Sequence, residues 1–434
     1  MTVEPSAGAD ENLPAPDDLD AAARSVLRDH WHVDGYTVPN AVIYPHQWLW
    51  DSCFHAVIWA HLHSPDRALA ELRNAFAHQG PDGFVPHLTY WQAPGIHEDL
   101  WGRARTSCIT QPPMYGHAIA ELVRRGTHVP DDLTLAAADG LAHLLARRRT
   151  GGLVPALHPW ETGCDDSPRW DAWCPAPWSR PAWKAVKGDL VASLAMDPDP
   201  VTAGRDGTGP VGNPAFHPGS VVLSALTAFN VAELRWATGP DATPGSATLD
   251  RRRRADLEAD AAPLLPALEL AWDDRARTWA DTPGGGIPGV APSRRVRTLE
   301  ALLPTLVVRD RDQVAAALAS LVDPTAFGAA HGPTQVHRGE RTYDPDTYWR
   351  GPAWPQLSYL LWLAASRRGA AEVADVVATT FVAGAVRSGM AEHWHPDTGS
   401  GQGAQPQSWT GLAAVTWSAQ RAGTPPAVGE RAPR

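Results

Sequence analysis

Sulfur-containing residues are scarce in this sequence of 434 residues. Cysteine and methionine occur four times each, and the cysteines lie far apart without a CxxC or CxxH spacing. This pattern argues against a disulfide framework and against a structural zinc site. No basic residue precedes Arg24, so a secretory signal is not expected either. The reducing cytoplasm is therefore the expected location.

Long apolar runs and an excess of positive charge are also missing. No segment approaches the roughly 18 consecutive apolar residues that a membrane-spanning helix needs. The 37 basic and 48 acidic residues give a formal charge of −11, which should repel nucleic acid and anionic lipid. We expect a globular protein with neither a nucleic-acid nor a membrane partner. The sequence leaves the oligomeric state open.

Signatures of cofactor and metal binding are absent from the sequence. The Gly-rich segment 281–288 lacks the Lys-Ser/Thr of a P-loop and the preceding strand of a dinucleotide-binding fold. The pairs His61/His63 and His393/His395 have no third ligand at a regular spacing. We therefore expect no cofactor and no metal.

Apolar residues recur at helical spacing in roughly twelve segments. These segments are 18–31, 47–63, 65–79, 111–126, 131–148, 218–238, 251–274, 296–307, 310–322, 353–368, 370–388 and 408–421. Short turns and long loops alternate between them, and the fixed repeat of a solenoid is missing. This pattern predicts an all-α fold, a single (α/α)6 toroid whose long loops gather on one face. We expect the domain to span 17–421, between disordered tails at 1–16 and 422–434.

Tryptophan is unusually frequent, with 20 residues against 7 Tyr and 7 Phe. Its flat ring suits stacking on a sugar, although it also fills cores. In the loop 153–178, indoles alternate with the carboxylates of Glu161, Asp165, Asp166 and Asp171. A carboxylic acid held away from water can stay protonated and can protonate a glycosidic oxygen. Alternatively, Asp165 or Asp166 only caps backbone N–H groups at a turn.

A second acidic cluster begins at Glu392, near the other end of the chain. Glycosidases pair an acid with a carboxylate base. Carboxylates so far apart in sequence can meet only in a fold that closes on itself, as a toroid does. The alternative is that Glu392 is solvated beyond the end of a helix.

Two further clusters, 44–51 and 346–355, combine Trp with Asp and, in the second, Arg. Arg beside Asp and Trp can hold a carboxylate that binds hydroxyl groups. Trp48 and Trp50 are two positions apart, so on a helix they would face different sides. At most one of them should then belong to the core, which leaves the other, together with Asp51, available to a ligand.

Several segments together resemble glycoside hydrolase family 63 and its trehalase-like relatives. WETGCDDSPRWD is similar to the segment that carries the acid in that family, and the stretch from Glu392 to Trp409 is similar to the one that carries the base. YPHQWLWDSCFHA, DGFVPH, TSCITQPP and YWRGPAW resemble the bacterial mannosylglycerate and glucosylglycerate hydrolase branch. The matches extend from residue 44 to residue 412. The resemblance implies an (α/α)6 toroid and an inverting α-glycosidase of a small carbohydrate, without a redox cofactor.

The resemblance also implies roles for individual residues. By position, Asp165 corresponds to the general acid and Glu392 to the general base. The side chains that we expect to bind the substrate are Tyr44, Trp48, Trp50, Asp51, Gln111, Tyr348, Trp349, Arg350, Trp354, Gln407 and Trp409.

Two positions depart from the pattern of these relatives. Asp166 replaces an Asn, and its carboxylate could raise the pKa of Asp165 or point outward. Ser224 lies near the position where the glycerate-specific relatives have an Arg. Without that Arg an anionic aglycone loses its bidentate partner. We therefore expect a neutral α-glucoside or α-mannoside to be preferred.

Two other classes of function stay open. A non-catalytic sugar-binding protein on the same toroid would keep the indoles but lose one of the two carboxylates, and both are present. A cyclase or isomerase is the second class: the nearest Asp-rich motif for a terpene cyclase is 17–20, and a sugar epimerase would need a His pair such as His55 and His393.

Overall fold

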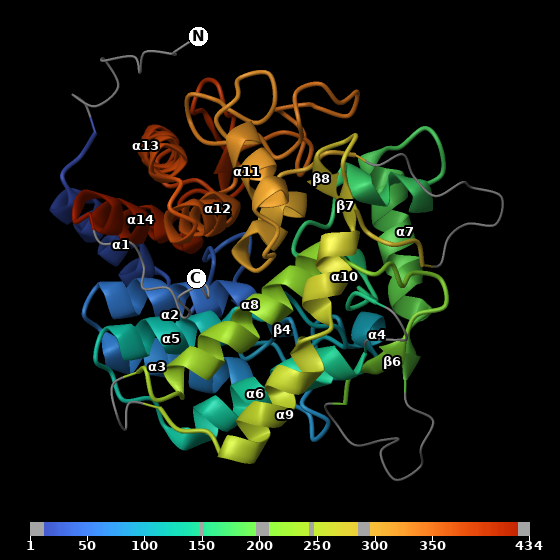
Figure 1. The fold of residues 1–434 in the computed structure, drawn as a ribbon. Coiled ribbons are helices and arrows are strands. Elements are labelled where there is room, and N and C mark those ends of the chain that lie inside the picture. Colours follow the sequence, from blue (N-terminus) through green and yellow to red (C-terminus); the bar gives the residue numbers. More distant parts are fainter. Residues whose placement is uncertain (1–12, 148–151, 197–207, 243–246, 285–295, 424–434) are drawn as a thin grey trace.

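The computed structural model describes residues 13–147, 152–196, 208–242, 247–284 and 296–423 (Figure 1). The α-helices are α1 (Pro16–Asp29), α2 (Leu49–His61), α3 (Pro65–Phe76), α4 (Glu98–Trp101), α5 (Tyr115–Arg124), α6 (Asp131–Ala146), α7 (Arg180–Ala192), α8 (Val221–Ala237), α9 (Arg251–Ala261), α10 (Leu264–Leu270), α11 (Arg311–Ser320), α12 (Pro355–Arg367), α13 (Ala371–Arg387) and α14 (Leu412–Arg421). The 3-10 helices are η2 (Pro159–Thr162), η3 (Pro168–Trp173), η4 (Glu300–Leu306) and η5 (Ser408–Gly411).

Strands are short and occur as antiparallel pairs. The pairs are β1 (Trp31–His32) with β2 (Tyr36–Thr37), β3 (Gln47–Trp48) with β4 (Leu88–Thr89), β5 (Ala195–Met196) with β6 (Pro210–Gly212), β7 (Trp272–Asp273) with β8 (Thr278–Trp279), and β9 (His393–Trp394) with β10 (Gly401–Gln402). Such ribbons are too small to form a core of their own. They fix the ends of the loops that join the helices.

Six helical elements form a closed ring within the described part of the chain. Each contacts the next in the order α2, α5, α8, η4, α12 and α14, and α14 returns to α2. The outer elements α3, α6, α9 with α10, α11 and α13 pack on the inner partner that precedes each of them, and α1 covers α14. Figure 1 shows this closure, with the red α14 beside the blue α1. The predicted all-α (α/α)6 toroid is confirmed.

Burial follows the sequence of each element. In α2, 12 of 13 residues are buried, whereas α1 and α3 bury a narrower stripe. A helix that is apolar on all sides must be covered on all sides, so α2 belongs to the inner ring. The inner element η4 is a 3-10 helix, and it contains Pro304, which lacks the N–H that an α-helical turn would use at that position.

The loops that lead into the inner helices gather at one end of the ring. Short turns join α2 to α3, α5 to α6, η4 to α11 and α12 to α13, so these partners run antiparallel and the inner helices begin at the same end. Trp48 immediately precedes α2, Trp354 precedes α12, and Gln407 precedes η5, which leads into α14. Three of the expected substrate-binding residues therefore lie at one end of the toroid.

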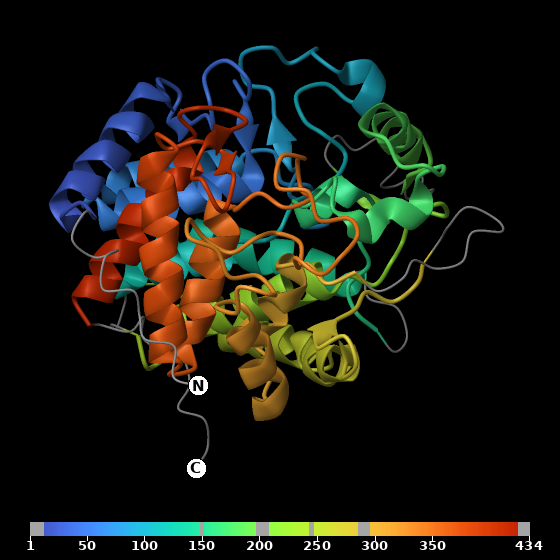
Figure 2. The ribbon, with the colours of Figure 1, turned by 90° about the horizontal axis from the view of Figure 1, so that it is seen from above.

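Two helical segments differ from the sequence expectation. The expected helix 251–274 is divided into α9 and α10, with Pro263 at the break. Helix α7 lies within the stretch 150–216 that was expected to be a long loop. It begins after Ser179, whose hydroxyl accepts a hydrogen bond from the backbone N–H of Ala182, and it lies against α4 (Figure 2).

Within the described ranges no helix is both long enough and apolar enough to cross a membrane. Most of the two predicted tails, 1–16 and 422–434, falls outside the described residues. Of the N-terminal one, Pro16 already belongs to α1.

Candidate active site

A pocket of about 640 Å³ is lined by both Asp165 and Glu392. Nine of the eleven expected substrate-binding residues also line it: Tyr44, Trp48, Trp50, Asp51, Gln111, Tyr348, Trp349, Gln407 and Trp409. The loop before each of several inner helices contributes to this lining. The fold thus brings residues from both ends of the chain to one cavity.

Asp165 lies in the loop between η2 and η3. Its Oδ2 accepts hydrogen bonds from the ammonium of Lys187 at 2.5 Å and from the indole N–H of Trp160 at 3.1 Å. Trp183 donates to the backbone carbonyl of Asp165 at 2.8 Å. Burial acts to raise the pKa of Asp165, but the positive charge of Lys187 outweighs it and holds this pKa below its ordinary value.

Asp166 points into the same group of side chains rather than outward. Its Oδ1 lies 2.6 Å from Nζ of Lys187, and its side chain is 3% exposed. Burial and then the charge of Asp165 raise the pKa of Asp166 to about 6. The sequence left open whether the second carboxylate raises the pKa of Asp165 or points outward. It does not point outward; Lys187 stabilises the charge on Asp165, and the raised pKa is that of Asp166.

Glu392 is almost fully buried on the loop that leads into β9. Its Oε1 accepts a hydrogen bond from the hydroxyl of Tyr44 at 3.0 Å, and Tyr348 lies at 3.5 Å from the same oxygen. The backbone N–H of Ala404 donates to Oε2 at 2.9 Å. Burial raises the pKa of Glu392 above its ordinary value, although the bonds from Ala404 and Tyr44 oppose this rise. A carboxylate held in this way can accept a proton from water.

Four buried polar atoms of the lining have no hydrogen-bond partner in the described structure. They are the indole N–H groups of Trp48 and Trp349, Oδ1 of Asp51 and Oε1 of Gln407. Two donors and two acceptors are therefore available to a ligand. Because an unpaired buried polar group is unfavourable, this set suits a ligand with several hydroxyl groups.

Aromatic rings form the walls of the pocket. Trp50 and Trp409 meet edge to face with ring centroids 5.8 Å apart. Trp349 lies against Trp354, with parallel rings 3.7 Å apart. Trp349 faces the cavity, whereas Trp354 is fully buried and does not line it. Trp354 was expected to contact the substrate, but it only packs against the face of Trp349 that is turned away from the pocket.

The structure explains why the WETG segment ends in a glycine, Gly163. It has φ +71° and closes η2, and a Cβ at this position would lie 2.5 Å from the ring of Trp50. Both the left-handed backbone and the close approach require a residue without a side chain. The loop that carries Asp165 is thereby held against Trp50, and Gly163 itself lines the pocket.

Arg350, also expected to bind substrate, lies outside the pocket lining. Its guanidinium binds Asp171, with Nη1 2.9 Å from Oδ2, and lies over the ring of Trp178. Glu161, another carboxylate of the 153–178 loop, binds Arg147. These charges hold the loop in place and do not face the cavity.

The expectation about an anionic aglycone was based on the wrong position. Ser224 is fully buried in α8, and its hydroxyl accepts a hydrogen bond from the backbone N–H of Val154. The residue at position 224 does not line the pocket, so it does not set the charge of the pocket. The cations of the lining come from α7: Arg180, Lys184 and Lys187. These cations were not expected, because the segment that forms α7 was interpreted as a loop.

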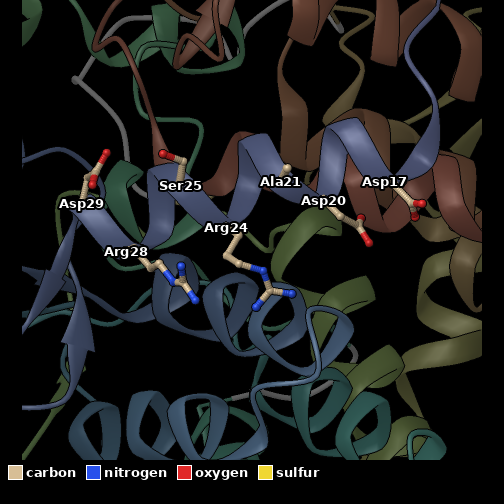
Figure 3. A pocket seen from close by; sticks show the side chains of 7 residues that line it. All are labelled: Asp17, Asp20, Ala21, Arg24, Ser25, Arg28 and Asp29. Atoms are coloured by element: carbon tan, nitrogen blue, oxygen red, sulfur yellow. The ribbon is translucent and has the colours of Figure 1, made fainter.

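A second cavity, of about 660 Å³, runs along α1 (Figure 3). Its lining consists of charged and small residues of this one helix, without an aromatic ring: Asp17, Asp20, Ala21, Arg24, Ser25, Arg28 and Asp29. The acidic segment considered for a terpene cyclase belongs to this surface, where Asp20 binds His61 at 2.8 Å.

The histidine pair considered for an epimerase does not meet the pocket. His55 is buried and shares a 2.6 Å hydrogen bond with Ser408, and His393 packs on Trp354. Burial lowers the pKa of each ring to about 3. Neither side chain belongs to the pocket lining.

One group of possible metal ligands, His117, Glu121 and Glu233, lies between inner helices α5 and α8. The carboxylate of Glu233 binds Arg124 and Arg367 as well as His117. These cations already satisfy its oxygens, so we interpret the group as a structural ion network.

Comparison with known proteins agrees with this geometry. Residues 44–410 match the family described as the mannosylglycerate hydrolase MGH1-like glycoside hydrolase domain. The chain is similar to the mannosylglycerate hydrolase of Rubrobacter radiotolerans, with 30% identity over 92% of this chain and 96% of that protein. It is 26% identical to the glucosylglycerate hydrolase of Mycolicibacterium hassiacum, over 93% and 98% of the two chains. The crystal structure of a family 63 mannosylglycerate hydrolase of Thermus thermophilus in complex with glucose superposes with a TM-score of 0.72, at 25% identity over 92% and 99% of the two chains.

Proposed function

The chain belongs to the family of mannosylglycerate hydrolase MGH1-like glycoside hydrolases and is an inverting α-glycosidase, and we propose that its substrate is an α-linked hexosyl glycerate. The observation that carries this proposal is the single pocket in which Asp165 and Glu392 meet among indole rings. Two carboxyl groups beside a sugar ring are what glycoside hydrolysis needs.

The proposed mechanism assigns one proton transfer to each carboxyl group. Asp165 gives its proton to the glycosidic oxygen while the bond from that oxygen to the anomeric carbon breaks. Glu392 takes a proton from a water molecule, and the oxygen of this water bonds to the anomeric carbon from the opposite face of the ring. The products are a free hexose with inverted configuration and glycerate.

The hexose would occupy the part of the pocket around Trp50 and Asp51. The C–H face of the ring can stack on an indole, and the unpaired atoms of Trp48, Asp51 and Gln407 can bind its hydroxyl groups. Burial and the charge of Glu392 raise the pKa of Asp51 well above its ordinary value, which favours its protonated form. A protonated carboxyl group can donate a hydrogen bond to one sugar hydroxyl and accept one from another.

The glycerate carboxylate would lie toward α7. Arg180 is 67% exposed, contacts the ring of Tyr348 and lines the pocket, and Lys184 lies one turn further along the helix. Lys187 is already bound to Asp165 and Asp166, so it cannot serve the aglycone in the same way. Two cations at the mouth of the pocket can attract an anionic substrate and bind its carboxylate.

A substrate comparison tests this proposal. Glucosylglycerate and mannosylglycerate are compared with glucosylglycerol, which keeps the glycosidic bond but lacks the carboxylate. We expect the glycerate glycosides to have the higher kcat/KM. A preference for the neutral glycoside would contradict the assignment of the aglycone.

We also propose a cytoplasmic location and a single domain of 17–421. The four cysteines are free and buried, which fits a reducing compartment. Limited proteolysis tests the domain limits: we expect cleavage near the ends of the chain and a stable fragment close to 17–421.

A further inference from the structure

Asp165 and Asp166 share one ammonium group. Nζ of Lys187 is 2.5 Å from Oδ2 of Asp165 and 2.6 Å from Oδ1 of Asp166. Because they share this Nζ, the two carboxylate oxygens lie within 5.1 Å of each other. The side chains are 13%, 3% and 9% exposed for Asp165, Asp166 and Lys187. The mechanism proposed above uses only Asp165 of these three.

The charges of this group do not balance without a further proton. Among these three buried side chains, two carboxylates and one ammonium would leave one net negative charge, which is unfavourable. Arg180 lies 3.7 Å from Oδ2 of Asp166 but is 67% exposed, so water screens it and it offsets this charge only in part. One proton on the carboxyl pair makes the group neutral.

The two carboxyl groups differ in their access to the pocket. Asp165 is the more exposed of the two, and its Oδ2 also accepts the indole N–H of Trp160. Asp166 is the more buried, and its Oδ2 lies 3.7 Å from Nε of Arg180. Both groups line the pocket, and the greater exposure of Asp165 favours it as the one that meets the substrate.

We propose that Asp166 and Lys187 are positioning residues: Asp166 holds the catalytic proton in the resting enzyme and transfers it to Asp165, and Lys187 holds the two carboxyl groups together. This inference rests on the proposed role of Asp165 as the acid. The proton passes from the carboxyl group of Asp166 to that of Asp165, which binds the same ammonium, and from Asp165 to the glycosidic oxygen as the glycosidic bond breaks. Lys187 keeps its charge throughout. The carboxyl pair then regains one proton from solvent, which balances the proton that Glu392 releases there.

The other titratable groups near Asp165 are not suited to supply its proton. Burial lowers the pKa of His87 and of His158 to about 3, so both rings are neutral. Burial raises the pKa of Tyr348 far above its ordinary value. The charged and titratable groups that face the pair from the packed elements are Arg180 and Lys187 of α7, His158, His87, Cys164, Tyr44, Tyr348 and Glu392.

The pH profile of kcat/KM tests the proposal with two variants that act in opposite directions. In Asp166→Asn, Asp165 is left with Lys187 alone, so its pKa falls and the alkaline limb should move down by about one pH unit. In Lys187→Met the cation is lost, so the pair holds its proton more tightly and the alkaline limb should move up by a similar amount. Asp189→Asn removes an exposed carboxylate from the same helix and should leave the profile unchanged.

Infrared spectroscopy of the enzyme without substrate gives a second measurement that does not depend on turnover. We expect the wild-type enzyme to show a protonated carboxyl band that titrates near pH 6 and is missing from both Asp165→Asn and Asp166→Asn. Asp189→Asn should retain the band. This measurement remains valid if Lys187→Met does not fold.

The two proposals fail in different ways. The inference about Asp166 and Lys187 would be overturned if the alkaline limb of kcat/KM were the same in wild type and in Asp166→Asn. It would also be overturned if the limb moved in the same direction in Asp166→Asn and in Lys187→Met. A carboxyl band that persists in Asp166→Asn would also overturn it. Failure of the proposed function would instead appear as a folded wild-type enzyme that hydrolyses neither glycerate glycoside.

Discussion

The hydroxyl of Tyr44 donates a hydrogen bond to Oε1 of Glu392 over 3.0 Å, although 348 positions separate the two residues in the chain. Burial and then the charge of Glu392 raise the pKa of Tyr44, so the phenol remains a donor. On the other side of the carboxylate, a Cβ at Gly403 would lie 2.2 Å from Oε2, so only glycine allows this approach. The closure of the ring thus positions one oxygen of the proposed base, and the nearby segment of Gly403 and Ala404 positions the other.

Removal of either proposed catalytic carboxyl group should abolish most of the activity. We expect Asp165→Asn and Glu392→Gln each to lower kcat by about 10²- to 10⁴-fold, because each removes one proton transfer. Binding of product glucose, measured by calorimetry, should change much less. Near-normal activity of Asp165→Asn together with an inactive Asp166→Asn would instead assign the acid to Asp166.

The cations of α7 should matter for glycerate and not for a neutral aglycone. Alanine at Arg180 or Lys184 should raise KM for glucosylglycerate by roughly tenfold, and by less at high salt, because a charge-assisted contact is lost. KM for glucosylglycerol should stay within about twofold of wild type. Arg251→Ala, an exposed change on α9, is the matched control. Equal effects on both substrates would contradict a carboxylate contact.

Gly163, in the loop that carries Asp165, should not tolerate a side chain. Gly163→Ala combines a left-handed backbone with a clash against Trp50, and we expect it to lower the free energy of unfolding by about 2–4 kcal/mol. Gly102→Ala is the control, because Gly102 has φ +66° but nothing within 4 Å of the added Cβ. Its cost should be only about 1–2 kcal/mol. Similar losses in both variants, measured by urea unfolding, would show that the contact with Trp50 contributes nothing.

Glu71 should make stability fall as the pH rises. It is fully buried, and burial raises its pKa to about 8 although the bonds from Thr37 oppose this. Between its ordinary pKa and about 8, the unfolded chain releases the proton while the folded protein keeps it, so stability is complete at low pH and is lost toward about pH 8. Glu71→Gln should reduce this loss by up to roughly 4 kcal/mol.

The measurement for Glu71 is the free energy of unfolding at about pH 5 and about pH 8. Glu372→Gln, an exposed change on α13, should follow the wild-type dependence. A wild-type protein that loses no more stability than Glu71→Gln between the two pH values would contradict a raised pKa for Glu71.

The sequence predicted the ring well because its signal is local. Helical spacing and burial on all sides follow from the order of apolar residues, so the inner helices could be placed before the structure was known. Trp48 and Trp50 show the limit of this reasoning. Both line the pocket. The expectation that they face different sides of one helix does not apply, because Trp48 belongs to β3 and only Trp50 belongs to α2. A prediction that treated both as helical could not find this.

The cationic side of the site could not be predicted, because it depends on tertiary contacts. Lys187 lies 22 positions from Asp165, in a segment rich in Trp, Pro and Gly that favoured a loop. The start signal of α7, Ser179 before Arg180 and Pro181, was present in the sequence and could have indicated the helix. That its lysine binds two carboxylates required the packed structure.

The anomer that is formed first tests the central claim most directly. Proton NMR during the first turnovers of an α-hexosyl glycerate follows the anomeric hydrogen of the released sugar before mutarotation. If Asp165 acts as the acid and Glu392 activates water from the opposite face, the first sugar must be the β-anomer. Initial release of the α-anomer would mean that Glu392 does not direct the water in this way and would contradict the proposed mechanism.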